Sequence, residues 1–183
     1  KRESINKLNS QLPKGTLKKI FNSLEIDILP NGNLPVGEDG LAILDFALVS
    51  IHSSFRIDKN NMTKRVLRAL SQPNVKIFAH PTGRLIGKRE SVELDWDKIF
   101  LFCKEHNIWI EINADPHRLD LPDYLVQEAV NSGILLTLGT DAHSSLGMNN
   151  MSYGVDVARR GWAKKSDIIN TRNLKEFEIL LNR

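Results

Sequence analysis

Side chains that can bind metal ions or move protons recur at the ends of short apolar segments of this chain. The six are Glu25, His52, His80, Glu111, Asp141 and His143. In folds that alternate strands and helices, the carboxyl ends of the strands and the loops after them meet at one mouth, where active sites form. Core stability does not require histidine or glutamate at successive strand ends. The pattern therefore predicts a metal site of the hydrolase kind.

The types of these side chains narrow the chemistry. Imidazole and carboxylate ligands together suit zinc, manganese or iron, and two or three such ions can activate water and clamp a phosphoryl group. The strongest element is Asp141-Ala142-His143, because side chains two residues apart on an extended segment point to one side. We expect this pair to bind one ion or two neighbouring ions.

Each of these residues also has a simpler explanation when it is taken alone. Glu25 lies in the alternating run LEIDIL and is compatible with a solvent-facing carboxylate. Asp141 is compatible with a helix N-cap, and His52 and His80 with structural roles at strand ends. Their recurrence at strand ends favours one shared site over separate explanations.

The remaining histidines and the cysteine are predicted to have structural or surface positions outside the metal site. His106 is expected to cap the end of a helix, and His117 to lie on the surface, with substrate contact as the alternative. Cys103 lies on the apolar stripe of a predicted helix and is expected in the core. One cysteine cannot form an internal disulfide, which fits a reducing cytosol, so a cytoplasmic location is expected.

Basic residues gather in two short segments, although the net charge is only +3. One segment holds Arg84, Lys88 and Arg89, and the other holds Arg159, Arg160, Lys164 and Lys165. Each is compatible with a solvated surface or with phosphate binding through charge and hydrogen bonds.

The apolar pattern predicts strands alternating with helices. The strands are expected around residues 17–28, 46–51, 75–79, 108–112 and 134–138. Helices are expected around residues 3–12, 41–44, 62–70, 95–103, 121–129, 149–160 and 173–181. This order favours an α/β fold with a parallel sheet, and five strands are too few to close a parallel barrel.

Helix-end signals support these boundaries. Asp95 is a predicted N-cap, Asn173 and Glu176 form a predicted capping box, and Ser132-Gly133 has the composition of a helix end. No apolar run approaches the roughly 20 residues that span a bilayer, so no membrane partner is expected. The 183 residues are predicted to form one domain.

Six segments, spread from about residue 20 to residue 170, resemble the PHP (polymerase and histidinol phosphatase) domain, in particular the carboxyl-terminal PHP domain of bacterial family X DNA polymerases. These segments are SLEIDILPNG, LVSIHSSF, FAHPTGRLIGKR, IEINADPHRLDLP, TDAHSS and YGVDVARRGW. The resemblance implies a distorted (β/α)7-type barrel, incomplete here, with up to three manganese or zinc ions at its mouth.

The resemblance also implies roles for individual residues. Glu25 would bridge two ions, His52 and His80 would complete one of them, Asp141 would bind the other, and His143 would bind a third. Glu25 and Asp141 are therefore the expected catalytic residues. Phosphate contacts are expected from Arg84, Arg118 and Arg160.

One departure from the family pattern bears on activity. The family begins with a strand that carries a His-x-His motif, and no two histidines of this chain are separated by a single residue. The chain is therefore expected to be a carboxyl-terminal portion of the domain, residues 1–183, that lacks the first strands. A homodimer that covers the open sheet edges, or pairing with the missing amino-terminal half, is expected, because open edges invite pairing.

The resemblance implies a phosphoesterase that acts on nucleic acid, as a 3′–5′ exonuclease or 3′-end processing activity in DNA repair, next to a polymerase module. Its partner would be DNA, at the 3′ ends of single strands. Weak or no turnover is expected of this chain alone. Two alternatives stay open: a small-molecule phosphatase of the histidinol-phosphate type, and a catalytically inactive structural module of the polymerase.

Overall fold

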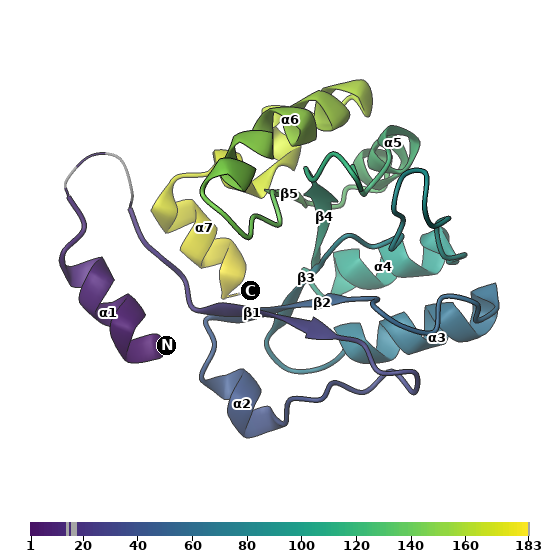
Figure 1. The fold of residues 1–183 in the computed structure, drawn as a ribbon, viewed down its shortest axis with the longest axis horizontal. Coiled ribbons are helices and arrows are strands. Elements are labelled where there is room, and N and C mark those ends of the chain that lie inside the picture. The colour runs from purple at the N-terminus through teal and green to yellow at the C-terminus, as the bar shows by residue number, and fades with distance from the viewer. Residues whose placement is uncertain (14, 16–17, 183) are drawn as a thin grey trace.

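The computed structural model describes residues 1–13, 15 and 18–182 and contains five parallel strands in one open sheet (Figure 1). The strands are β1 (Ser23–Asp27), β2 (Phe46–Ser50), β3 (Val75–Phe78), β4 (Trp109–Asn113) and β5 (Leu136–Gly139). They follow one another across the sheet in chain order, and all four neighbouring pairs are parallel. The predicted α/β fold with an incomplete parallel barrel sheet is confirmed.

Helices connect the strands. They are α1 (Arg2–Ser10), α2 (Glu38–Ala42), α3 (Lys59–Leu70), α4 (Trp96–Glu105), α5 (Asp123–Asn131), α6 (Met151–Arg160) and α7 (Leu174–Leu181). Short 3-10 turns lie at η1 (Leu146–Asn150), η2 (Lys165–Asp167) and η3 (Ile169–Thr171). No helix in the described part of the chain combines the length and the apolar character needed to cross a bilayer.

The two faces of the sheet carry different apolar layers. Along β4, Ile110 and Ile112 join the large core beneath α3, α4 and α5, whereas Trp109 joins a smaller cluster with Phe177 and Leu181 of α7. Figure 1 shows α7 on the opposite side of the sheet from α3 and α4. Because side chains alternate along a strand, Glu111 projects to the α7 side, and Glu25, next to the core residue Ile26, does the same.

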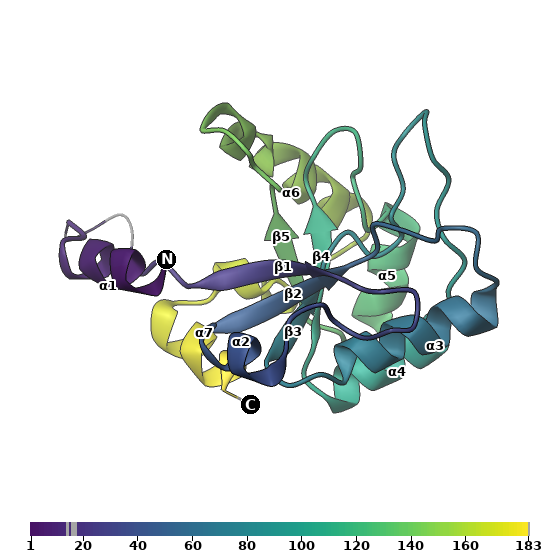
Figure 2. The ribbon, with the colours of Figure 1, turned by 60° about the horizontal axis from the view of Figure 1, so that its bottom comes forward.

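The direction of the strands turns markedly from β1 to β5, as Figure 2 shows, which is the normal twist of a parallel sheet. The outer edge of β5 is covered. The Asn170 side chain accepts from the Leu138 N–H at 2.7 Å and donates to the Leu138 carbonyl at 3.0 Å. Asn170 thus occupies hydrogen-bonding positions that a further strand would use at this edge.

Local sequence signals located three helix ends correctly. Asp95 accepts from the Lys98 N–H, Asn173 and Glu176 form the predicted capping box, and Gly133 after α5 has a φ of 78°. The first strand was predicted too long. It begins at Ser23, and of the predicted start Leu17 lies outside the described residues.

Candidate metal centre

Three of the predicted ligands come from three adjacent strands. Glu25 lies in the middle of β1, His52 follows β2 after Ile51, and His80 follows β3 after Ala79. The parallel register pairs Asp27 with Ser50 and Val49 with Phe78, so the carboxyl ends of these strands lie side by side. Neighbouring strand ends therefore bring together residues that are far apart in the sequence.

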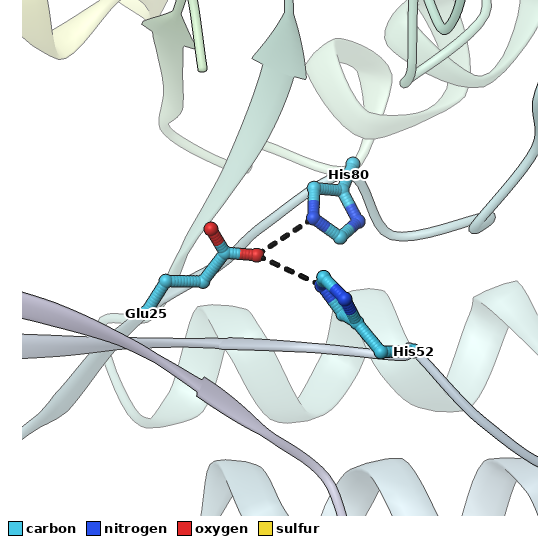
Figure 3. A group of neighbouring side chains, drawn as sticks. All are labelled: Glu25, His52 and His80. Carbon is cyan, nitrogen blue, oxygen red and sulfur yellow. Dashed lines mark hydrogen bonds and ion pairs between the residues drawn. The ribbon is translucent and has the colours of Figure 1, made fainter. Parts of the chain in front are cut away.

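The three side chains converge on one oxygen atom. Oε1 of Glu25 lies 2.7 Å from Nε2 of His80 and 3.1 Å from Nε2 of His52 (Figure 3). One ligand atom from each of the three residues lies within 4.8 Å of the other two. Two imidazole nitrogens and a carboxylate oxygen at this spacing form a donor set that suits a divalent transition metal.

Burial differs across the site. The His80 side chain is 1% exposed, whereas those of Glu25 and His52 are 35% and 40% exposed. The site is therefore closed beneath His80 and open to solvent beside Glu25 and His52, which gives an ion a way in.

The electrostatics favour a charged carboxylate. Hydrogen bonds from His52 and His80 outweigh burial and hold the pKa of Glu25 far below its usual value. Burial lowers the pKa of His80, but the hydrogen bond to Glu25 and the charges of Glu25 and Glu111 outweigh it, and the pKa of His80 is raised. Without an ion, hydrogen bonds thus hold the three side chains together.

The second nitrogen of each imidazole has a different environment. Nδ1 of His52 lies 3.7 Å from Oδ1 of Asp27, which leaves Nε2 for a metal ion. Nδ1 of His80 is buried and has no partner among the described protein atoms. Histidine ligands are commonly oriented by a carboxylate that is hydrogen-bonded to the second ring nitrogen. Asp27 lies near this nitrogen of His52 but beyond hydrogen-bond distance.

A buried arginine fastens the segments that follow Glu25 and His52. Nε of Arg65 donates to the Leu29 carbonyl and Nη1 to the Ser53 carbonyl, both at 2.9 Å, and Nη2 donates to the Ile28 carbonyl. Arg65 is 3% exposed. Sequence reasoning missed this clamp, and its signal was an arginine on the buried face of α3, between Met62 and Ala69.

Asp141 and His143 lie together but outside the group of three. Oδ1 of Asp141 lies 3.8 Å from Nδ1 of His143, whose side chain is 89% exposed. Among the residues that the structure describes, only Glu25, His52 and His80 form a group of three potential ligands at metal-binding spacing. The prediction of an extended segment here was wrong, because Asp141 has a left-handed φ of 51°.

The three predicted phosphate contacts have different environments. Arg84 donates from Nε to the Arg118 carbonyl at 2.7 Å and from Nη2 to the Leu119 carbonyl. Arg160 is 64% exposed, and its Nε donates to Asp123 at 2.8 Å.

Arg118 lies near the candidate ligands and has a guanidinium N–H group without a hydrogen-bond acceptor in the described chain. Its side chain is 14% exposed, and Nε lies 3.6 Å from Oδ2 of Asp141. Its Nη1 is buried and has no hydrogen-bond partner in the described chain. A buried guanidinium N–H without an acceptor is costly, so this position is suited to an anionic oxygen.

His106, His117 and Cys103 have the structural and surface positions that were predicted for them. His106 is the C-cap of α4, and its ring stacks on Phe102. His117 is 75% exposed, with Nδ1 2.9 Å from Asp115. Cys103 is fully buried, and burial raises the pKa of its thiol to about 12.

Comparisons with known proteins find relatives that align with most of the chain. No protein-family model matches the chain. The DNA polymerase/3′-5′ exonuclease PolX of Bacillus subtilis (strain 168) is 41% identical over 165 residues, which are 90% of this chain and 29% of that protein. A probable phosphatase of Clostridium acetobutylicum is 29% identical over 172 residues, and one of Thermoanaerobacter sp. (strain X514) is 25% identical over 173 residues. These alignments cover 88% and 87% of this chain and 67% of each relative. The chain is thus similar to a segment that spans less than a third of a DNA polymerase/3′-5′ exonuclease, and to the larger part of proteins named as phosphatases.

Proposed function

We propose that this chain is the carboxyl-terminal portion of a PHP domain, a metal-dependent phosphoesterase domain that acts on the 3′ ends of DNA. The observation that carries the proposal is the convergence of Glu25, His52 and His80 on one point at the strand ends. Similarity to a DNA polymerase/3′-5′ exonuclease over 90% of the chain supports the choice of nucleic acid as substrate. Similarity to probable phosphatases supports phosphate-ester chemistry in general.

The residues at the centre would hold a manganese or zinc ion. Such an ion supplies a Lewis acid that lowers the pKa of water and neutralises charge on a phosphoryl group. Glu25 presents a charged oxygen at physiological pH, because its pKa is lowered. The Nε2 atom of His80 must be free of its proton to bind a cation. The half-exposed His52 and Glu25 line the side from which a substrate arrives.

Asp141 and His143 are proposed ligands for further ions, with Asp141 as the second catalytic carboxylate. They follow β5, which runs parallel to the strands that carry or precede the other three ligands. The Arg118 side chain lies near Asp141, and the Arg118 backbone carbonyl accepts a hydrogen bond from the Arg84 side chain. In the proposal, Arg118 Nη1 donates to a phosphate oxygen, Arg84 holds the Arg118 loop, and Arg160 contacts phosphate farther from the centre.

The proposed setting is a longer polypeptide in the cytoplasm, with a polymerase module and the first strands of the barrel as neighbours. A second copy of the chain would be an alternative cover for the outer edge of β1. Light scattering of the chain across a concentration series tests the second alternative, since a monomer at all concentrations contradicts the homodimer.

Incubation with a 5′-labelled single-stranded oligonucleotide in Mn²⁺ or Zn²⁺ tests the function. The expected result is slow shortening from the 3′ end, abolished by a chelator and by Glu25→Gln. Phosphate release from histidinol phosphate, with the oligonucleotide left intact, would instead assign the small-molecule phosphatase. Failure to hydrolyse either substrate by a chain that binds metal would favour the structural module, for which the single three-ligand group among the described residues is the supporting observation.

A further inference from the structure

Glu111 is a buried carboxyl group for which the proposed chemistry has no use. It lies on β4 and is 5% exposed. Its Oε2 accepts the backbone N–H of His80 at 2.8 Å and the side-chain Nδ2 of Asn113 at 3.2 Å. Burial raises its pKa to about 7. Burial of a carboxyl group lowers the stability of the fold unless its contacts compensate, so we expect a role in those contacts.

The hydrogen bond from Glu111 holds a residue with unusual backbone geometry. His80 has a φ of 27°, on the left-handed side, which is disfavoured for a residue with a side chain. The N–H of His80 points at Oε2 of Glu111, while its ring points at Oε1 of Glu25. A fixed N–H holds the peptide plane before His80 and so helps to fix the Cα–Cβ bond from which the ring projects.

Gly139 provides the space that Glu111 occupies. A Cβ atom at this position would lie 2.0 Å from Oε1 and 3.0 Å from Cδ of Glu111. Gly139 is absent from the positive-φ glycines of the described chain, so its backbone does not require glycine. The strand β5 therefore carries a glycine, at some cost to strand stability, where the carboxyl group of Glu111 meets it.

We propose that Glu111 is the positioning residue for His80 and that Gly139 makes room for it. Glu111 fixes the backbone of His80 through its N–H and so aims Nε2 at the candidate metal position. The role of Glu111 in metal binding rests on the proposed function. The hydrogen bond that anchors His80 is present in the metal-free chain. Outer residues that orient metal ligands change metal affinity by about 10–100-fold when they are replaced.

Titration with Co²⁺, followed by visible absorption, tests the metal-bound state of the whole chain. Glu111→Ala should weaken Co²⁺ binding by about 10–100-fold. Glu111→Gln should stay close to wild type, because its Oε1 accepts the same N–H. In a His80→Ala background, Glu111→Ala should cause little further loss, since a residue that acts only through His80 has nothing left to position. Equal binding by wild type and Glu111→Ala, or full additivity with His80→Ala, would overturn the proposal.

Two further measurements keep the test decisive if Glu111→Ala does not fold. Gly139→Ala retains the Glu111 side chain but displaces its carboxyl group, and should weaken Co²⁺ binding with unchanged circular dichroism. Gly37→Ala is its control, because a Cβ atom there meets no atom within 4 Å. Wild-type affinity in Gly139→Ala would contradict the proposal.

Hydrogen exchange of the His80 amide in chelator separates the anchoring from the proposed function. The amide should exchange slowly in the wild type and in Glu111→Gln, and fast in Gly139→Ala. Slow exchange in a wild type that binds no Co²⁺ would support the anchoring and reject the metal-dependent function. Equal exchange in wild type and Gly139→Ala would reject the anchoring.

Discussion

Nε2 of His80 lies 2.7 Å from Oε1 of Glu25, although the two residues are 55 positions apart in the chain. The contact joins the middle of β1 to the segment after β3, and these two strands do not pair with each other because β2 lies between them. His52, from the end of β2, completes the group from the middle. The order of the sheet thus turns a scattered set of sequence positions into one donor set.

The Glu25–His80 contact predicts a pH window for stability without metal. The pKa of Glu25 is lowered from 4.5, so its contribution is present above pH 4.5 and is lost as the pH falls through the folded pKa. The pKa of His80 is raised from 6.5, so its contribution is present below pH 6.5 and is lost as the pH rises through the folded pKa. Urea unfolding in chelator should therefore show the largest deficit of Glu25→Gln between pH 4.5 and 6.5. A deficit that does not vary with pH would contradict the charged contact.

The raised pKa of Glu111 predicts a pH dependence of stability opposite in sign to that of Glu25. Its folded pKa of about 7 exceeds the usual 4.5, so its contribution is favourable at low pH and is lost as the pH rises toward 7. Glu111→Gln carries no charge and avoids this loss. Its free energy of unfolding in chelator, relative to wild type, should rise by an amount on the order of 3 kcal/mol between pH 4.5 and 8. A constant difference over this range would show that Glu111 titrates normally.

Replacement of Arg65 should destabilise the fold more than its surface neighbour does. Arg65→Met removes the guanidinium that donates to the carbonyls of Ile28, Leu29 and Ser53, and should cost about 3 kcal/mol. Arg68→Met is the matched control, because Arg68 lies on the same helix and is exposed. Urea midpoints of the two variants measure the difference, and equal midpoints would show that Arg65 is not a clamp.

Arg118 is expected to act on substrate binding. Arg118→Met removes a donor whose Nη1 has no partner in the described chain, and should raise the KM for a phosphate ester about tenfold or more. Arg159→Met removes the same charge from an exposed position of α6 and serves as control. Steady-state kinetics in saturating Mn²⁺ provide the comparison. An equal KM for the two variants would remove Arg118 from the proposed phosphate site.

Much of the fold was accessible from local patterns. The strands containing FALVS and VKIF, the N-cap Asp95 and the capping box at Asn173 depend on neighbouring residues, and their positions were predicted closely. The three converging ligands were predicted for a similar reason, because strand ends of a parallel sheet meet at one edge.

The rest depended on contacts between distant segments. The left-handed backbone at Asp141 breaks the predicted extended segment, and a spacing of two residues does not reveal it. Nor did the sequence reveal that Arg65 binds carbonyls beyond β1 and β2, or that Gly139 makes room for Glu111. Such roles follow from three-dimensional neighbours and not from periodicity.

Calorimetric titration with Zn²⁺ tests directly whether Glu25, His52 and His80 hold a divalent cation. We expect a saturable site whose affinity falls in Glu25→Gln, His52→Ala and His80→Ala by more than the roughly 10–100-fold loss that follows when outer residues are replaced. His106→Ala and His117→Ala, which change histidines outside the group, should bind as the wild type does. Wild-type affinity in the three ligand variants, or no binding by the wild-type chain, would show that these residues do not form a metal site.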